Sequence, residues 1–158
     1  MAISDRPGGL TALAALNGFF AISSGFSALQ RIITSYRLFA YQQDPEASQS
    51  RWSRRDLESM IEAKVDPLQM ELLGVLSAVV ALLLACSVWG LLKRNRWAGK
   101  WCSTLAALGM ASVSLLAIQV LPLNQLRGVG MDLVRQLFYP LFLLFMVHGI
   151  FRKDLRPR

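Results

Sequence analysis

Long apolar runs alternate with polar segments along the chain. Four of these runs have 20, 21, 20 and 19 residues: Leu10–Leu29, Leu72–Leu92, Cys102–Leu121 and Leu133–Phe151. A bilayer core of ~30 Å is crossed by about 20 helical residues, so each run is long enough to cross it once. The pattern predicts an all-α polytopic membrane protein in which residues 1–158 form a single membrane domain, a four-transmembrane-helix bundle.

Small residues recur four positions apart in the first three apolar runs, as in Gly74 and Ala78. This spacing is typical of contacts between membrane helices, because small side chains let two backbones approach closely. The fourth run contains bulky side chains instead, among them Phe138 and Phe142. We therefore expect the fourth helix to present more of its surface to lipid or to a protein partner.

The segment 31–66 between the first two runs is the largest polar region of the chain. Its first part keeps enough apolar residues to continue the first helix beyond the bilayer, until Asp44 and Pro45 end it. Ser53 and Asp56 then have the spacing of a helix-capping box. Apolar residues follow at helical intervals, at Leu57, Met60, Ile61 and Val65.

These residues predict a short amphipathic helix from about Arg54 to Lys64. We expect its apolar face to cover the end of its own bundle. Two alternatives are contact with the bilayer interface and a docking face for another protein.

Composition agrees with a membrane protein, because 54% of the 158 residues are hydrophobic and the mean hydropathy is +0.40. The net charge of +7 resides entirely in two segments, the link Lys93–Lys100 and the tail Arg152–Arg158. With four spans these segments lie on one side of the membrane, and an excess of Lys and Arg marks that side as cytoplasmic. We therefore expect both termini inside and residues 31–66 outside, and no nucleic-acid partner.

Candidate chemistry is sparse. Cys86 and Cys102 fall in the cytoplasmic half of the second and third runs, where a structural disulfide is not expected.

His148 is the only histidine, which excludes a site that needs two. It is a candidate ligand for a haem or pigment, although a hydrogen bond to a neighbouring helix is the commoner role. Asn17, Ser23, Ser24 and Ser27 are interpreted in the same way, as interhelical hydrogen-bond donors.

Several polar residues are expected near the outer end of the bundle. Gln30 and Arg31 end the first run, and Glu71 and Arg135 lie close to the outer ends of the second and fourth runs. An ion in the hydrocarbon is costly, so we expect Glu71 and Arg135 to face each other, with Gln119 in the same layer. Such a polar clasp would set the register of the helices. The alternatives are a proton or ion path and an Arg135 side chain that extends to the headgroups.

Two stretches carry a resemblance to known proteins. They are Arg6–Thr11, which leads into the first run, and the pair Trp89–Lys93 and Arg96–Ala98 between the second and third runs. They resemble a pattern of small bacterial four-helix integral membrane proteins. The resemblance implies a bacterial inner membrane and four spans, and it implies no activity and no functional residue.

No catalytic motif or paired acid and base is present in the sequence, so we expect a protein that is not an enzyme. The function expected is that of an accessory or scaffolding subunit, which packs against a larger membrane complex or against itself. The partner-facing candidates are Leu57, Met60, Ile61, Phe138 and Phe142. A small ion or lipid transporter and a pigment- or haem-associated subunit are the alternatives. Apart from the bilayer lipids, no bound cofactor is expected.

Overall fold

The structure, a computed structural model, describes residues 8–44, 51–93, 97–120 and 138–150. Every element in these ranges is helical: α1 (Gly8–Gln43), α2 (Arg51–Glu62), α3 (Pro67–Leu92), α4 (Ser103–Val120), and the π-helical segments Trp97–Cys102 and Met146–Ile150. A fifth helical stretch, Phe138–Ile150, is shorter and includes the second π-helical segment.

Three of the helices are long and apolar enough to cross a membrane: Gly8–Gln43, Pro67–Leu92 and Gly99–Val120. The expected fourth span overlaps the apolar helix Phe138–Ile150, and the rest of that span lies outside the described residues. The structure thus has the helical, membrane-type architecture that the apolar runs predicted. In α3, Pro67 occupies the first turn and the Asp66 carboxylate accepts a hydrogen bond from the Leu68 N–H, which explains where the helix begins.

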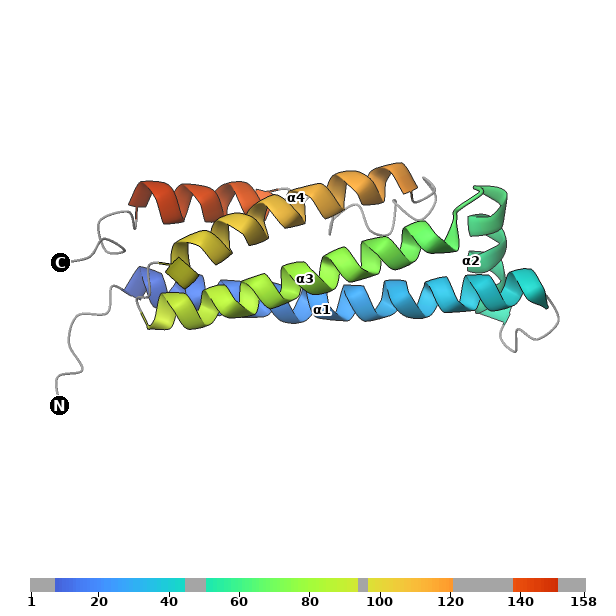
Figure 1. The fold of residues 1–158 in the computed structure, drawn as a ribbon, viewed down its shortest axis with the longest axis horizontal. Coiled ribbons are helices and arrows are strands. Elements are labelled where there is room, and N and C mark those ends of the chain that lie inside the picture. Colours follow the sequence, from blue (N-terminus) through green and yellow to red (C-terminus); the bar gives the residue numbers. More distant parts are fainter. Residues whose placement is uncertain (1–7, 45–50, 94–96, 121–137, 151–158) are drawn as a thin grey trace.

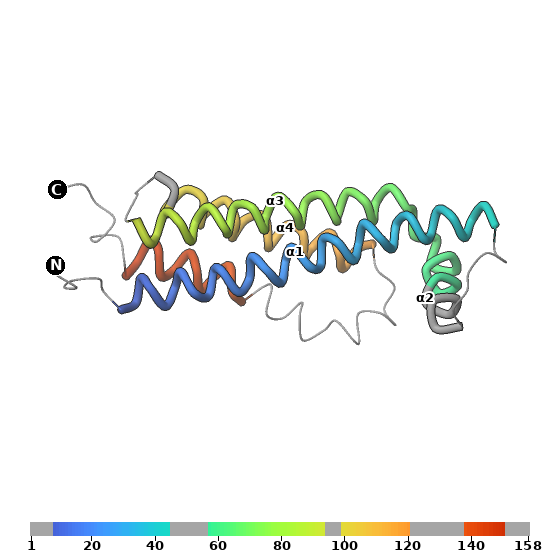
Figure 2. The backbone as a smooth tube through the Cα atoms, turned by 90° about the horizontal axis from the view of Figure 1, so that it is seen from below, coloured from blue at the N-terminus to red at the C-terminus, as the bar shows by residue number. Residues whose placement is uncertain are grey.

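The helices α1 and α3 are antiparallel and lie side by side over most of their length (Figures 1 and 2). They approach closely at Gly74, where a Cβ atom would lie 2.7 Å from Ile32 Cγ1 and 3.3 Å from the Ala28 carbonyl oxygen. On α4, a Cβ atom at Gly109 would lie 2.7 Å from Val80 Cγ2. Glycine is therefore needed at both positions for the helices to pack at this distance.

The main core lies between α1, α3, α4 and the helix Phe138–Ile150, and it extends along α3 from Leu91 to Leu73. Its most deeply buried members are aliphatic or small: Leu13, Leu84, Ala107, Ala117, Leu143 and Val147. The last helix therefore packs in the same core as the three long ones.

A second, smaller core lies at the end of the molecule where α2 lies crosswise to α1 (Figures 1 and 2). It is formed by Leu38, Leu57, Met60, Val65 and Met70. The helix α2 begins about three residues earlier than expected and ends two residues earlier. Of its apolar residues, Leu57 and Met60 are buried against the same chain, as the interpretation of a cover over its own bundle requires. Ile61 is exposed.

Candidate functional site

A chain of hydrogen bonds joins four helices near the start of α1. The Tyr139 hydroxyl donates to the Asn17 side-chain carbonyl oxygen, and Asn17 Nδ2 donates to Ser87 Oγ at 2.8 Å. Ser87 Oγ lies 2.5 Å from Ser103 Oγ, which in turn donates to the Gly99 carbonyl oxygen at 2.6 Å. Since the single hydroxyl proton of Ser103 is used on Gly99, Ser87 is the donor to Ser103. We call Asn17, Ser87, Ser103 and Tyr139 the interhelical network.

The interhelical network is buried and complete. Its four residues are at most 6% exposed, and within the described residues no buried side-chain polar atom lacks a partner. The Tyr139 ring stacks on Phe20 with 3.7 Å between centroids, which fixes the tyrosine from a second side. A fully paired polar layer in an apolar core selects one register of the helices.

A second polar group lies farther along α1, in a small recess between α1, α3 and α4. The recess is open to the outside and has room at its base for about one water-sized group. It is lined by Ser24, Ser27, Arg31, Ser77, Val80, Met110 and Val113. Arg31 donates to Ser77 Oγ at 2.5 Å, and Ser77 donates to the Leu73 carbonyl oxygen at 2.7 Å. We call this the Arg31 recess. The expectation for Arg31 was a place in the outer polar layer, and the structure adds that its guanidinium is directed between the helices.

The outer surface of α1 is a continuous apolar stripe. Its exposed residues alternate at intervals of three and four, as on one face of a helix: Phe19, Ile22, Phe26, Leu29, Ile33 and Tyr36. Phe39 extends the exposed apolar surface by one more residue. These side chains have no partner within the described residues that would bury them.

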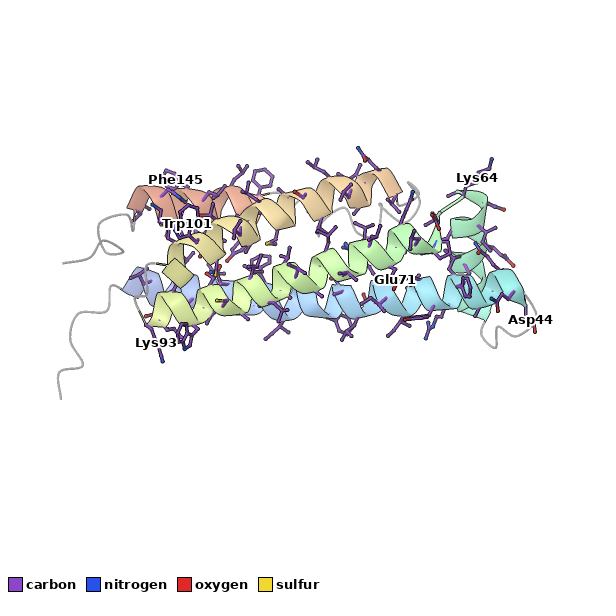
Figure 3. All side chains as sticks on the ribbon, in the orientation of Figure 1. Asp44, Lys64, Glu71, Lys93, Trp101 and Phe145 are labelled. Carbon is purple, nitrogen blue, oxygen red and sulfur yellow. The ribbon has the colours of Figure 1, made fainter. Side chains whose placement is uncertain are left out.

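The residues of the expected polar clasp are only partly described. Glu71 and Gln119 are both exposed on the surface of the bundle, and Figure 3 shows Glu71 on α3 near the α2 end. Arg135 lies outside the described residues, so the pairing of Glu71 with Arg135 stays a prediction.

The remaining site candidates fall on the surface or in the second core. His148 is exposed within the π-helical segment Met146–Ile150, and its role as a cofactor ligand stays a prediction.

Phe138 and Phe142 are exposed, as is Phe145, which points away from the bundle in Figure 3. Leu57 and Met60, by contrast, are buried within the chain and are not available to a partner in this arrangement.

Two cysteines come together where α3 ends and α4 begins. Cys102 Sγ lies 3.4 Å from Cys86 Sγ, and both thiols are free. Within the described residues no group of three or more His, Cys, Asp or Glu side chains is arranged to hold a metal ion.

Of the expected interhelical donors, Asn17 is confirmed by its bond to Ser87. Ser24 and Ser27 form no hydrogen bond within the described residues.

The sequence did not identify Ser87, Ser103 or Tyr139 as partners. The sequence gives one weak indication of these partners, since Ser87 and Ser103 are hydroxyl residues inside apolar runs. Their pairing depends on how the helices are rotated, and a single sequence does not give that rotation.

No family model matches the chain, and comparisons with the curated proteins and with the solved structures found no significant match. The functional argument therefore depends on the residues and geometry described above.

Proposed function

We propose that the chain is a non-enzymatic, four-span membrane protein that acts as an accessory or scaffolding subunit by packing α1 against another membrane protein. In this proposal the membrane is a bacterial inner membrane, and both termini are cytoplasmic. The amphipathic helix α2 lies on the extracytoplasmic side. The helix Phe138–Ile150 belongs to the fourth span, and the positive charges of Lys93–Lys100 and Arg152–Arg158 set the orientation.

The observation that carries the subunit role is the length of the apolar stripe on α1. The helix has 36 residues, or about 54 Å at ~1.5 Å per residue, whereas the hydrocarbon core is only ~30 Å thick. Even a strong tilt of ~40° leaves part of α1 outside the hydrocarbon. Its exposed apolar residues continue into that part, at Ile33, Tyr36 and Phe39.

Lipid tails do not cover apolar side chains beyond the hydrocarbon, so these residues need another cover. The helix α2 does not supply it, because α2 packs on the other face of α1, around Leu38. A contiguous exposed apolar surface of this kind is typical of a protein–protein contact. A helix of a second membrane protein, or of a second copy of this chain, is long enough to lie along the apolar stripe of α1.

The packing at the start of α1 supports a structural role over transport. A transporter needs a polar path across the membrane, and here the core between Asn17 and Leu84 is filled by aliphatic side chains and the interhelical network. The Arg31 recess is the polar space that favours a small ion or lipid transporter as the second candidate. Three of its lining residues, Val80, Met110 and Val113, belong to the main core itself.

The subunit role is tested by site-specific photocrosslinking in native membranes. A photoreactive amino acid is placed at Tyr36 or Phe39 on the exposed stripe, and at the exposed Glu62 of α2 as the control. We expect an adduct of one discrete mass from Tyr36 and Phe39 and none from Glu62. A mass of two chains would identify the partner as a second copy. Absence of a protein adduct from both stripe positions would contradict the proposal.

A further inference from the structure

The Arg31 recess combines a guanidinium with three serines. Ser24, Ser27 and Arg31 follow one another on one face of α1 at intervals of three and four residues, and Ser77 faces them from α3. Among the described residues, the rest of the lining is apolar and contains no carboxylate, and Arg31 forms no ion pair.

The polar groups of the recess offer hydrogen-bond donors in excess of acceptors. A guanidinium has five N–H donors, and among the described residues Arg31 is paired only with Ser77. The hydroxyl proton of Ser77 is already donated to Leu73. Within the described part of the chain, the hydroxyls of Ser24 and Ser27 make no hydrogen bond, so both remain available as donors.

The direction of the Arg31 side chain places this charge inside the bilayer rather than at its surface. Side chains on a helix tilt toward its N-terminus, and here that means toward Ser27 and Ser24 and away from the α2 end of the molecule. Ser77, the partner of Arg31, precedes Leu92 by 15 residues, or about 22 Å along α3. In a ~30 Å core that begins near Leu92, the guanidinium lies about 8 Å below the far boundary.

A charged group at this depth is costly unless something compensates it. An arginine near the membrane surface usually extends its charged group to the headgroups. Here the contact with Ser77 holds the guanidinium on the inner side of the Arg31 Cα atom. The compensation that matches four free N–H groups and two free hydroxyls is an anion with several oxygen acceptors.

We propose that the Arg31 recess binds a phosphate-type anion, with Arg31, Ser24 and Ser27 as its donors. The free space deep in the recess admits about one water-sized group, so one anionic oxygen enters and the rest of the phosphate stays at the mouth. The phosphate of a membrane lipid and inorganic phosphate share this chemistry. The inference goes beyond the packing role of α1, because the recess and the apolar stripe are on different faces of that helix.

The test measures thermal unfolding of the full chain in a neutral detergent and a gluconate buffer, followed by tryptophan fluorescence. The probes are dihexanoyl phosphatidylglycerol, dihexanoylglycerol as its neutral counterpart, and sodium phosphate. We expect phosphatidylglycerol to raise the melting temperature in a saturable way and dihexanoylglycerol to leave it unchanged. A saturable rise with sodium phosphate would identify the free anion as a ligand as well.

The variants show whether Arg31 is responsible. Arg31→Gln should abolish the rise or weaken the apparent affinity at least about tenfold, as expected for the loss of charge-assisted hydrogen bonds. The matched control is Arg37→Gln, which removes an exposed arginine of the same helix and should keep the full rise. The double variant Ser24→Ala, Ser27→Ala keeps the Arg31–Ser77 contact and should weaken the affinity several-fold.

Two results would overturn the proposal: no saturable rise with either anionic probe in the unmodified chain, or an equal rise in the Arg31→Gln variant. If that variant fails to fold, the double serine variant decides in the same way. These outcomes do not depend on crosslinking at Tyr36 and Phe39, so failure of the anion site and failure of the subunit role are distinguishable.

Discussion

Asn17 is central to the interhelical network, because its side chain bonds to side chains of two other helices through two different atoms. Its carbonyl oxygen accepts from Tyr139 and its Nδ2 donates to Ser87. It thereby connects α1 to α3 directly and to α4 through Ser103.

Replacement of Asn17 by Ala should therefore destabilise the bundle more than the loss of one hydrogen bond at an end of the interhelical network. We expect Asn17→Ala to lower the free energy of unfolding by about 1–3 kcal/mol, since it leaves the buried Tyr139 hydroxyl without its acceptor. Tyr139→Phe keeps the ring stacked on Phe20 and breaks only one of the two bonds that Asn17→Ala breaks, so it should cost less than Asn17→Ala. Denaturant unfolding in detergent micelles, followed by circular dichroism, measures both values.

The control is Ser112→Ala, because Ser112 is exposed and its hydroxyl bonds only to the Leu108 carbonyl oxygen of the same helix. Its effect should stay within about 0.5 kcal/mol. An Asn17→Ala effect no larger than that of Ser112→Ala would show that the network does not stabilise the bundle.

At the residue scale the sequence indicated that a residue forms an interhelical hydrogen bond, but not which residue is its partner. An asparagine within an apolar run predicts an interhelical hydrogen bond, and Asn17 makes one. The inward direction of Arg31 was not predicted, because it follows from the register of α1 against α3 at Ser77. Helix–helix register depends on contacts between segments far apart in the chain, which local patterns do not specify.

At the scale of the elements, the apolar runs located the long helices well. The expected run 72–92 corresponds to α3, and the expectation that the first helix continues until Asp44 and Pro45 is confirmed by α1 ending at Gln43. The start of α2 was the less accurate boundary, since the capping-box motif at Ser53 placed it after the first turn that the structure shows. A capping motif indicates a helix start only when the residues before it are not already helical.

The packing of α1 on α3 gives a prediction at this scale. A methyl group at Gly74 would meet Ile32 and the backbone of Ala28, whereas one at Gly25 would lie 3.9 Å from Ala81 Cβ, an ordinary contact. Gly74→Ala should therefore lower the free energy of unfolding by about 1–3 kcal/mol through overpacking. Gly25→Ala should be neutral or stabilising by up to about 1 kcal/mol, because alanine has the higher helix propensity.

The same unfolding measurement compares the two variants on one interface. Equal effects of Gly74→Ala and Gly25→Ala would mean that α1 and α3 do not approach at Gly74 as described. The sequence indicated Gly74 as a contact residue through its spacing from Ala78. Only the structure shows that Gly74 and Gly25 differ in the space around them.

At the scale of the whole molecule, α1 and α3 together form a rod with different ends. One end holds the start of α1, the interhelical network and Lys93. The other holds α2 and Lys64, as Figure 3 shows. In the proposed arrangement the membrane surrounds the apolar middle of this rod, so that α2 and Lys93 are on opposite sides. The subunit role and the anion site both presuppose this arrangement.

Cysteine accessibility in intact cells tests the membrane crossing most directly. In a background with Cys86 and Cys102 replaced by alanine, single cysteines at Lys64 and Lys93 are treated with a membrane-impermeant maleimide. Both positions are exposed in the structure, so accessibility reports the side of the membrane. We expect Lys64→Cys to react in intact cells and Lys93→Cys to react only after the membrane is opened. Reaction of both positions from the same side, or recovery of the chain in the soluble fraction, would contradict the account.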